Sequence, residues 1–598
     1  MKKIVLLYQQ FLNRLRQKTN RLQFMMYAAV ITGLIAGLGA VLLKTIVHFL
    51  QAWINRPVQH DYIYLVFPII GLLITVFITN RFFNGYIERG VGMVLRAIAR
   101  KSAFIPLSDT YKHIITSSIT VGLGGSAGLE APIVATGSAI GSNTARIHGM
   151  EYRERSLLLA CGAAAGIAAV FNAPIAGVIF AIEILLTETI VSYFIPLMIA
   201  SVTGALCSRI ILQESFLFNF RLREAFDYNN VPFYILLGFA AGFISLYYSR
   251  LFKKAEKGVH HMTRNSYARA AVAGILLAAI LFLFPPLFGE GYATVSMLAN
   301  DQATQIAEKF FAREYLNDWT LLAFVGAIIL LKPVAAGITL GAGGNGGNFA
   351  PSLFVGAYLG FFLSRMANNT KWLQLPEGNF SLVGMAGVLS GVMYCPLTAI
   401  FLIAEITNGY ELFIPLMIVS AISFFIVKHF EPYSMETRQL AIEGQIFTHR
   451  KEDNILNQFT AGSFIQDKYD SIGIDNNLAD LIVIINKSDR NIFAVTDKDN
   501  RYVGIIELND IKKKIFEPVN HQQIAIKSIV RKAAATIQEE ESMKKVMEKM
   551  DITQSWYLPV LNKERQFLGF LSKTRIFEKY REALANQADI YESESDHQ

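Results

Sequence analysis

One acidic residue lies in an apolar, glycine-rich stretch and has the type and setting to do chemistry. Glu130 belongs to the run Gly128-Leu129-Glu130-Ala131-Pro132. A proline suits the first turn of a helix, where no amide donor is needed, so this run predicts a helix N-terminus. Unpaired amides at such a terminus attract anions. An ionised Glu130 can occupy those amides itself, and a protonated Glu130 can leave them to another anion.

A second stretch repeats this pattern 219 residues later. It reads Gly347-Asn348-Phe349-Ala350-Pro351. Downstream, Pro174 and Glu183 return as Pro396 and Glu405. A repeat of this size in an apolar chain is typical of transport proteins with two inverted halves. One helix terminus contributes only about 0.3–2 kcal/mol, whereas stripping water from an ion costs tens of kcal/mol. Several termini must therefore converge on any anion.

The composition places most of the chain in a membrane. Hydrophobic residues make up 53% of 598, charged residues make up 17% and the mean hydropathy is +0.37, which excludes a soluble globular protein for most of the chain. The net charge of +8 reflects membrane topology rather than nucleic-acid binding, because basic residues crowd the first 21 positions. The positive-inside rule then predicts a cytoplasmic N-terminus. Three cysteines and scattered histidines indicate neither a disulfide framework nor a metal site.

These patterns predict an all-α polytopic membrane protein with two inverted-topology repeats, followed by a cytoplasmic α/β region. The predicted parts are an N-terminal cytoplasmic helix at 1–20, a membrane domain at 21–447 with repeats at about 25–212 and 230–430, α/β domains at 464–516 and 524–582, and a polar tail at 585–598.

In the region beyond Tyr433, short apolar runs alternate with charged segments. The expected strands are 481–485, 491–495, 502–506, 556–560 and 567–571, and the expected helices are 509–516, 542–550 and 574–584. The region resembles a tandem pair of CBS domains. That resemblance implies an adenine-nucleotide site with Asp510 as its best candidate residue. Glu507 and Arg575 each replace one signature residue, so a purely structural or dimerising module stays an alternative.

The membrane part resembles the CLC family of chloride channels and chloride/proton exchangers. The resemblance rests on the two glycine-rich runs, on Asn172-Ala173-Pro174-Ile175-Ala176-Gly177 and on Tyr433. It implies that Glu130 is the gating glutamate. The implied anion-binding residues are Gly128, Leu129, Ala131, Asn348, Phe349, Ala350, Tyr433, Gly90 and Val91. It also implies a homodimer with one pore in each subunit.

Three departures from the family pattern affect what the resemblance predicts. Arg89 stands where the family has an anion-binding serine, and we expect it to face the cytoplasmic vestibule while amides near Gly90 line the site. Ile184 stands where exchangers carry an inner glutamate, so Glu183 and Glu188 are the candidate substitute proton relay. Buried structural hydrogen bonding is the favoured interpretation of Glu183. Leu129 replaces a basic residue beside the gate.

The sequence therefore predicts a multi-pass protein of a bacterial inner membrane, with both termini cytoplasmic, that transports chloride or a similar small anion. It predicts no enzyme activity and no cofactor beyond the adenine nucleotide at the CBS pair. The missing inner glutamate favours passive conduction, with chloride/proton exchange through a substitute carboxylate as the alternative. A different class, a membrane-anchored nucleotide sensor that no longer transports, is disfavoured because a dead pore needs no carboxylate in the membrane.

Overall fold

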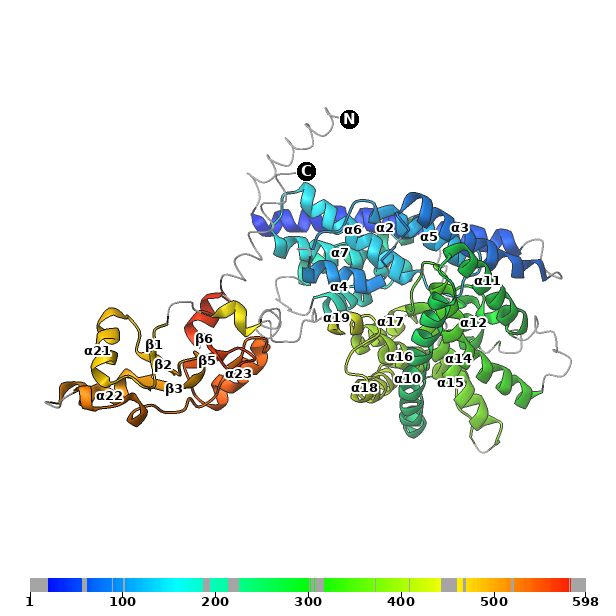
Figure 1. Cartoon of the computed structure of the whole chain (residues 1–598). Helices are drawn as coiled ribbons and strands as arrows, with labels where there is room; N and C mark the ends of the chain where they lie inside the picture. The colour runs from blue at the N-terminus through cyan, green and yellow to red at the C-terminus, as the bar shows by residue number, and fades with distance from the viewer. Residues whose placement is uncertain are drawn as a thin grey trace, which may run out of the picture. The chain divides into compact units, whose positions relative to one another are not determined.

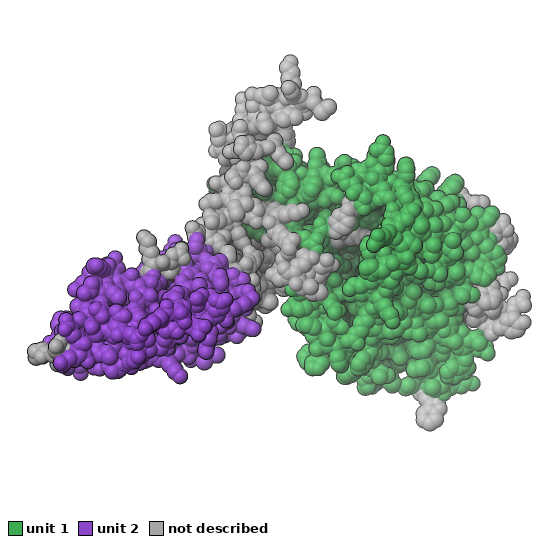
Figure 2. All heavy atoms as spheres, in the orientation of Figure 1, with its two compact units in different colours: residues 1–442 green, residues 443–598 purple. Residues whose placement is uncertain are grey.

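The chain forms two compact units, residues 1–442 and 443–598, in a computed structural model (Figure 2). The structure describes residues 20–55, 62–85, 87–88, 90–100, 103–186, 194–212, 225–300, 302, 306, 317–371, 373–407, 409–442, 460–465, 469–517, 521–579 and 581. Arg89 and Glu188, two residues singled out from the sequence, lie outside the described residues.

The first half of the membrane unit is helical. Its helices are α2 (Arg21–Asn55), α3 (Val66–Phe82), α4 (Gly90–Arg100), α5 (Asp109–Gly122), α6 (Glu130–Ile147), α7 (Tyr152–Phe171), α8 (Pro174–Phe180) and α9 (Phe194–Leu212). A 3-10 turn, η1 (Tyr62–Leu65), precedes α3, and a π-helical turn, η2 (Ala181–Leu185), extends α8. Figure 1 shows α2, α6 and α7 side by side, and they pack on one another.

The second half follows the same plan. Its helices are α10 (Val231–Met262), α11 (Ser266–Leu283), α12 (Tyr292–Ala299), α14 (Asp318–Gly341), α15 (Phe349–Asn368), α16 (Glu377–Met393), α17 (Pro396–Ile406), α18 (Phe413–Phe430) and α19 (Arg438–Ile442), with 3-10 turns at η4 (Tyr228–Asn230) and η5 (Pro285–Leu287). Within the described part of the chain, nine helices are long and apolar enough to cross a membrane. The short helices α8 and α17 are not among them.

The two halves contact each other through equivalent residues. The Ser126 amide donates to the Thr339 hydroxyl at 3.1 Å, and the Asn345 amide, 219 residues after Ser126, donates to the Thr120 hydroxyl at 3.1 Å. Gly128 and Gly347 pair as an antiparallel bridge. Each of these contacts from the first half to the second is matched by an equivalent contact from the second half to the first. The repeat seen in the sequence is therefore also a repeat of these contacts.

Close helix pairs in both halves are built on equivalent glycines. α6 packs on α7 and α15 packs on α16. A Cβ atom added at Gly141 would collide with the Leu158 carbonyl, and one added at Gly360 would collide with the Phe380 carbonyl. Glycine therefore lets two buried backbones meet at a distance that no side chain allows.

The second unit contains two similar sheets. β1 (Ser471–Gly473), β2 (Ile492–Thr496) and β3 (Tyr502–Glu507) form one sheet, and β4 (Ile537–Gln538), β5 (Tyr557–Leu561) and β6 (Phe567–Ser572) form the other. In each sheet the first pair is parallel and the second is antiparallel. Helices α21 (Leu478–Lys487), α22 (Leu508–Phe516) and α23 (Met543–Ile552) accompany the strands, and 573–579 is helical.

The two α/β copies complete each other. The turn η7 (Ala461–Phe464) lies before the first copy but packs in the core of the second, and η9 (Ile526–Ser528) lies between the copies but packs in the core of the first. A third apolar cluster joins the two sheets through residues such as Ile505 and Phe570. The pair therefore folds as one body.

One sequence prediction is wrong. Residues 481–485, expected as a strand, lie inside α21. The run of isoleucine and valine has strand propensity, but Asn477 and Asp480 form a reciprocal capping box that starts a helix. Leu481 is buried in the helix and Val483 is exposed, so packing of one helical face outweighs local propensity.

Candidate functional site

The N-termini of α6 and α15 meet inside the membrane unit. Each of Gly128 and Gly347 donates its amide to the other's carbonyl, with both distances at 2.9 Å. The helices then begin two residues later, at Glu130 and Phe349, with a proline in each first turn. The unpaired amides of both helices are therefore directed at one region.

The Glu130 carboxylate occupies the opposite helix terminus rather than only its own. Its Oε2 accepts a hydrogen bond from the Ala350 amide at 3.3 Å, at the start of α15. Its Oε1 accepts one from the Tyr292 hydroxyl. Glu130 is 1% exposed. A buried carboxylate on a helix N-terminus is held where a free anion would be held.

Gly128 must be glycine for this arrangement. A Cβ atom at Gly128 would collide with Glu130 Oε2 and would lie 2.9 Å from Ala350 Cβ. The lack of a side chain at Gly128 therefore leaves space for the Glu130 carboxylate. This steric requirement explains why a glycine stands two residues before Glu130 in the sequence.

The other residues predicted on the two runs lie around this carboxylate. Leu129, Ala131, Asn348, Phe349 and Ala350 are all buried. Asn348 accepts a hydrogen bond from the Tyr248 hydroxyl at 3.2 Å. The Phe349 ring packs against the rings of Phe171 and Phe180, with centroids at 5.6 and 6.4 Å.

The start of α4 also approaches this region. An added Cβ at Gly90 would lie 3.6 Å from Ala131 Cβ, and Gly90 has a φ of +66°. Val91 is 2% exposed. Three helix N-termini, those of α4, α6 and α15, therefore converge, as the dehydration argument from the sequence requires.

Tyr433 lies elsewhere in the structure. It is 41% exposed and lines a small separate pocket with Arg250, Tyr394 and Glu431. It does not line the cavity that reaches Ala131 and Asn348. Its role as an anion ligand stays a prediction that this arrangement does not support.

Sequence reasoning missed a hydroxyl and a second carboxylate that lie beside the Glu130 region. Tyr292 donates to Glu130, and Glu290 accepts from the Leu129 amide next to α6. Both belong to the run Gly289-Glu290-Gly291-Tyr292, in which an acidic residue stands between two glycines. Like Glu130, Glu290 is an acidic residue in a glycine-containing run that follows an apolar segment, and this was the available signal.

A buried lysine ties down the segment that carries Glu290. Lys332 is 0% exposed, and its Nζ donates to the carbonyls of Gly289 at 3.0 Å and Leu287 at 3.4 Å. The ammonium also lies 4.6 Å from the centroid of the Phe354 ring. A cation so engaged fixes a loop and is not free to bind a passing anion.

Two repeat-equivalent glutamates clamp the short helices α8 and α17. Glu405 accepts from the amides of Ile175 at 2.9 Å and Ala176 at 2.7 Å, at the start of α8. Glu183 accepts from the amides of Leu397 at 3.0 Å and Thr398 at 2.8 Å, at the start of α17, and from the Thr398 hydroxyl. Each glutamate thus caps the helix of the other half.

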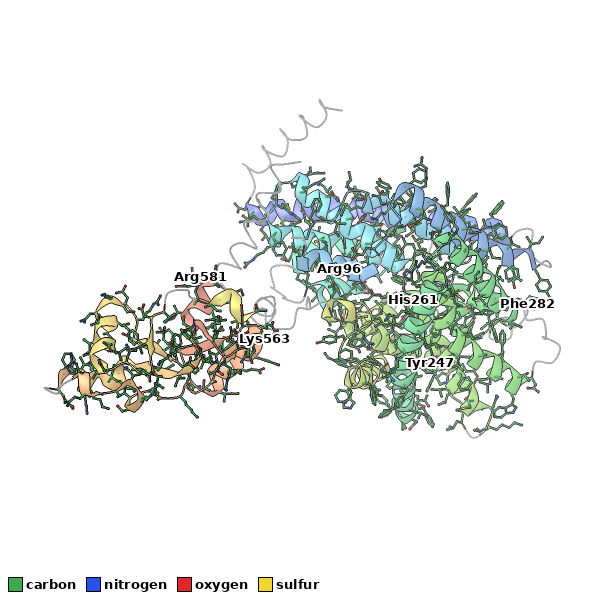
Figure 3. The ribbon with its side chains drawn as sticks, viewed as in Figure 1. Arg96, Tyr247, His261, Phe282, Lys563 and Arg581 are labelled. Carbon is green, nitrogen blue, oxygen red and sulfur yellow. The ribbon has the colours of Figure 1, made fainter. Side chains whose placement is uncertain are left out.

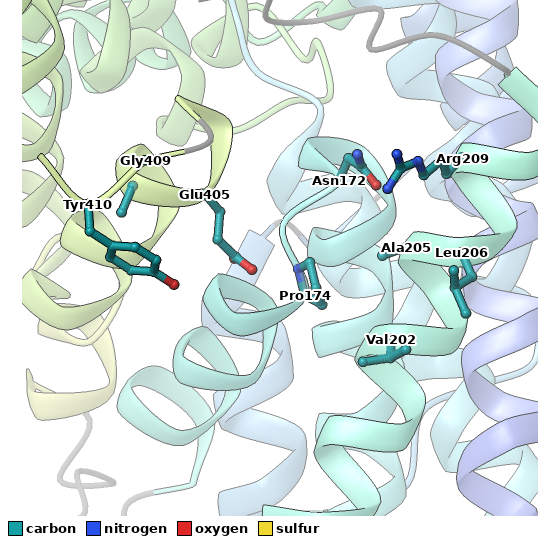
Figure 4. Close-up of a pocket in the computed structure, with 10 residues that line it drawn as sticks. Asn172, Pro174, Val202, Ala205, Leu206, Arg209, Glu405, Gly409 and Tyr410 are labelled. Atoms are coloured by element: carbon teal, nitrogen blue, oxygen red, sulfur yellow. The ribbon is translucent and has the colours of Figure 1, made fainter. Parts of the chain in front are cut away.

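The candidate relay residue Glu183 is therefore part of this reciprocal clamp. Figure 4 shows its counterpart Glu405 directed toward Pro174, beside a pocket of about 320 Å³ that Arg209 and Tyr410 also line. Three hydrogen bonds hold the Glu183 carboxylate at the start of α17, which favours a structural role over that of a mobile proton carrier.

A larger cavity leads to the converging helix starts. It measures about 490 Å³ and is lined by the glycine-rich loop at 343–347, by Ala131 and Asn348, and by the starts of α4 and α11. Arg96, which Figure 3 labels on α4, lines it and pairs with Glu88. This cavity reaches the site from the side of α4, α10 and α11.

In the second unit, the Asp510 carboxylate is already paired with an arginine. Its Oδ2 accepts from Arg531 Nε at 2.8 Å, and Arg531 also pairs with Glu507. A ribose that bound Asp510 would have to compete with this arginine. Among the described residues, no group of three or more His, Cys, Asp and Glu side chains is arranged to hold a metal ion.

Comparison with known proteins assigns both units. The profile of the voltage gated chloride channel family matches residues 71–428, and the CBS domain profile matches residues 461–517 and 526–582. The first match covers more than half of the chain.

Sequence relatives include both channels and exchangers. A putative chloride channel protein ClcB-like from Ralstonia nicotianae is 28% identical over 348 residues, which cover 57% of this chain and 77% of the relative. The chloride channel protein CLC-e of Arabidopsis thaliana is 24% identical, with 81% of this chain and 75% of the relative covered. An H(+)/Cl(-) exchange transporter ClcA from Vibrio cholerae is 29% identical, with 49% of this chain and 61% of the relative covered.

Solved structures share the fold. A slow cyanobacterial Cl-/H+ antiporter superposes with a TM-score of 0.60 at 21% identity, over 70% of this chain and 97% of the other. A eukaryotic CLC transporter gives 0.59 at 16% identity, over 92% of this chain and 97% of the other. The chain therefore belongs to the voltage gated chloride channel family, a family of membrane transport proteins rather than enzymes, and carries a C-terminal pair of CBS domains.

Proposed function

We propose that this protein moves chloride along a path that Glu130 opens and closes. The supporting observation is the Glu130 carboxylate on the Ala350 amide at the start of α15, where it takes the place of an anion. When Glu130 binds a proton, the carboxyl no longer competes for the amides, and chloride can replace it.

Passive conduction is the mode we favour, because a residue without an ionisable group stands where exchangers of the family carry an inner glutamate. Ile184 cannot ionise, and the neighbouring Glu183 is held by Leu397 and Thr398. Chloride/proton exchange is the second candidate. Its support is the seated Glu130, since a gate that must be protonated before each anion enters could couple the two fluxes.

The orientation and assembly are also proposals. We place both chain termini on the cytoplasmic side of a bacterial inner membrane, because basic residues crowd the first 21 positions. We place the end of α3 and the start of α4 on the same side, because basic residues of α10 and α11 line the cavity beside them. We further propose a homodimer, as the family resemblance implies. At the CBS pair, we propose that an adenine nucleotide can bind at Asp510 if Arg531 moves aside.

The gate is tested by following chloride current in planar bilayers whose two chambers are titrated separately. Glu130→Gln should conduct at every external pH and lose the rise in current on external acidification. Tyr292→Phe is a milder variant for comparison, because it keeps Glu130 and removes only one hydrogen bond to the ionised carboxylate. Losing a bond to a charged group should move the external pH midpoint upward by about one unit.

The same recordings address the transport mode. A wild-type reversal potential at the chloride equilibrium value, unaffected by a pH gradient, fits passive conduction, whereas a displaced value fits exchange. A Glu130→Gln variant that still titrates like the wild type would contradict the gating assignment.

A further inference from the structure

A second carboxylate lies on the third helix terminus of the site. Glu436 follows α18 and precedes α19, and the Gly92 amide at the start of α4 hydrogen-bonds to its carboxylate. Its Oε2 lies 3.5 Å from the position that a Cβ atom would take at either Gly90 or Gly92. The carboxylate therefore lies close against the backbone at the start of α4.

The position of Glu436 is on the route to the site. It lines the cavity of about 490 Å³ that also reaches Ala131, Gly347 and Asn348. Ala131 in turn contacts the start of α4 at Gly90. An anion that enters through this cavity meets the α4 terminus, with Glu436 on it, beside the region that Glu130 occupies.

The surroundings favour a carboxyl that can take up a proton. Desolvation raises the pKa of Glu436, the Gly92 amide lowers it, Glu256 raises it and Lys253 lowers it. The residue is still partly accessible, because it faces the cavity. Among the described residues, the other charged or titratable groups that line this cavity are Glu88, Arg96, His260 and Arg269.

We propose that Glu436 is a second gate, which controls the approach from the α4 side as Glu130 controls the site itself. Ionised, Glu436 occupies the α4 terminus in place of an anion. On taking a proton from water in the cavity, it releases the terminus to chloride. The inference rests on the proposed chloride path, and it adds a residue that neither the family motifs nor the repeat pointed to.

Chloride binding to the purified full-length protein in detergent tests the inference by isothermal titration calorimetry at pH 7.5. Glu436→Gln removes the competing charge and should tighten chloride binding between about 2-fold and 30-fold, the range expected for one helix terminus. Glu436→Asp keeps the charge but shortens the reach to Gly92, so it should also tighten binding. Melting temperatures of all variants confirm folding.

A matched control is Glu256→Gln, which removes the same charge from the same cavity. It takes away a repulsive neighbour of ionised Glu436 and should leave chloride affinity unchanged or weaker. Equal gains in chloride affinity in Glu256→Gln and Glu436→Gln would overturn the proposal, because the change in the net charge of the cavity would then explain both gains. Unchanged affinity in Glu436→Gln would overturn it as well.

Chloride efflux from liposomes at equal pH on both sides separates this inference from the function of Glu130. Glu130→Gln should still respond to acidification through Glu436, and Glu130→Gln with Glu436→Gln should not respond. If chloride efflux through the Glu130→Gln variant already does not respond to acidification, Glu436 is not a gate and the proposed function stands. If the wild type neither binds nor transports chloride, both proposals are wrong.

Discussion

The two halves of the membrane unit share a scaffold and differ in what they place at equivalent points. Thr120 and Thr339 make the same contact in opposite directions. At the helix starts, however, one half has Glu130 and the other has Phe349. On the preceding helix, His113 stands where the other half has Lys332. The threonines that obey the repeat hold the two halves together, whereas the positions that break it place a buried carboxylate, Glu130, in one half and a buried ammonium, Lys332, in the other.

The largest expected effect concerns the shared scaffold. Gly141→Ala and Gly360→Ala each place a methyl group on a backbone carbonyl of the paired helix. Overpacking against a backbone that cannot move should cost about 3 kcal/mol or more in either half. Thermal unfolding in detergent measures both.

Gly258→Ala is the control for these variants, because an added Cβ there has no atom within 4 Å. It should be neutral or stabilising by up to about 1 kcal/mol, the helix preference of alanine over glycine. Stable Gly141→Ala protein beside unstable Gly360→Ala protein would show that the two halves do not carry the fold equally.

The next effect concerns the charged asymmetry. Lys332→Met leaves two buried carbonyls without their donor and should cost on the order of 3 kcal/mol, because losing one member of a buried charged group is expensive. His113→Gln removes only a 3.3 Å contact with Asn345 and should cost about 1 kcal/mol. Melting temperatures compare the two, and a larger loss in His113→Gln would reverse the assignment of roles.

A smaller effect should appear at the reciprocal clamp. Glu183→Gln and Glu405→Gln each replace one of the two carboxylate oxygens that accept from amides with an NH2 donor, which should cost about 1–3 kcal/mol each. The Glu183 change should cost more, because Glu183 also accepts from the Thr398 hydroxyl. Thr398→Val should remove that difference. Neither glutamine variant should shift the reversal potential, and a shift in Glu183→Gln alone would restore that residue as a proton relay.

The smallest effect tests whether the two CBS copies also differ in chemistry. The first copy places Asp510 beside Arg531, whereas the second has Arg575 at the corresponding point. If adenine nucleotide binds at Asp510, it should stabilise the full-length protein by about 1.4 kcal/mol at ten times its Kd. Asp510→Ala should abolish the shift in melting temperature, and Arg531→Ala should enlarge it. If millimolar nucleotide does not shift the melting temperature, the CBS pair is a structural module.

Much of the fold was predictable because its signals are local. Glycine-rich runs before a proline predicted the starts of α6 and α15, and apolar runs predicted the spans. The strand predicted at 481–485 was wrong, because the cap formed by Asn477 and Asp480 outweighs β-branched propensity. The site was predictable only in part. Glu130 stood out as a carboxylate in an apolar run, but Tyr292 and Glu436 belong to segments 162 and 306 residues away.

The sequence by itself determined the two-fold plan, the membrane setting and the place of the carboxylate proposed as the gate, because spacing, hydropathy and turn chemistry are properties of neighbouring residues. Only the tertiary structure decided which carboxylate lies on which terminus. Glu130 reaches the start of α15, Glu436 that of α4, and Glu183 that of α17. Each glutamate meets amides of a helix distant in sequence, because a buried charge must find its donors wherever packing brings them.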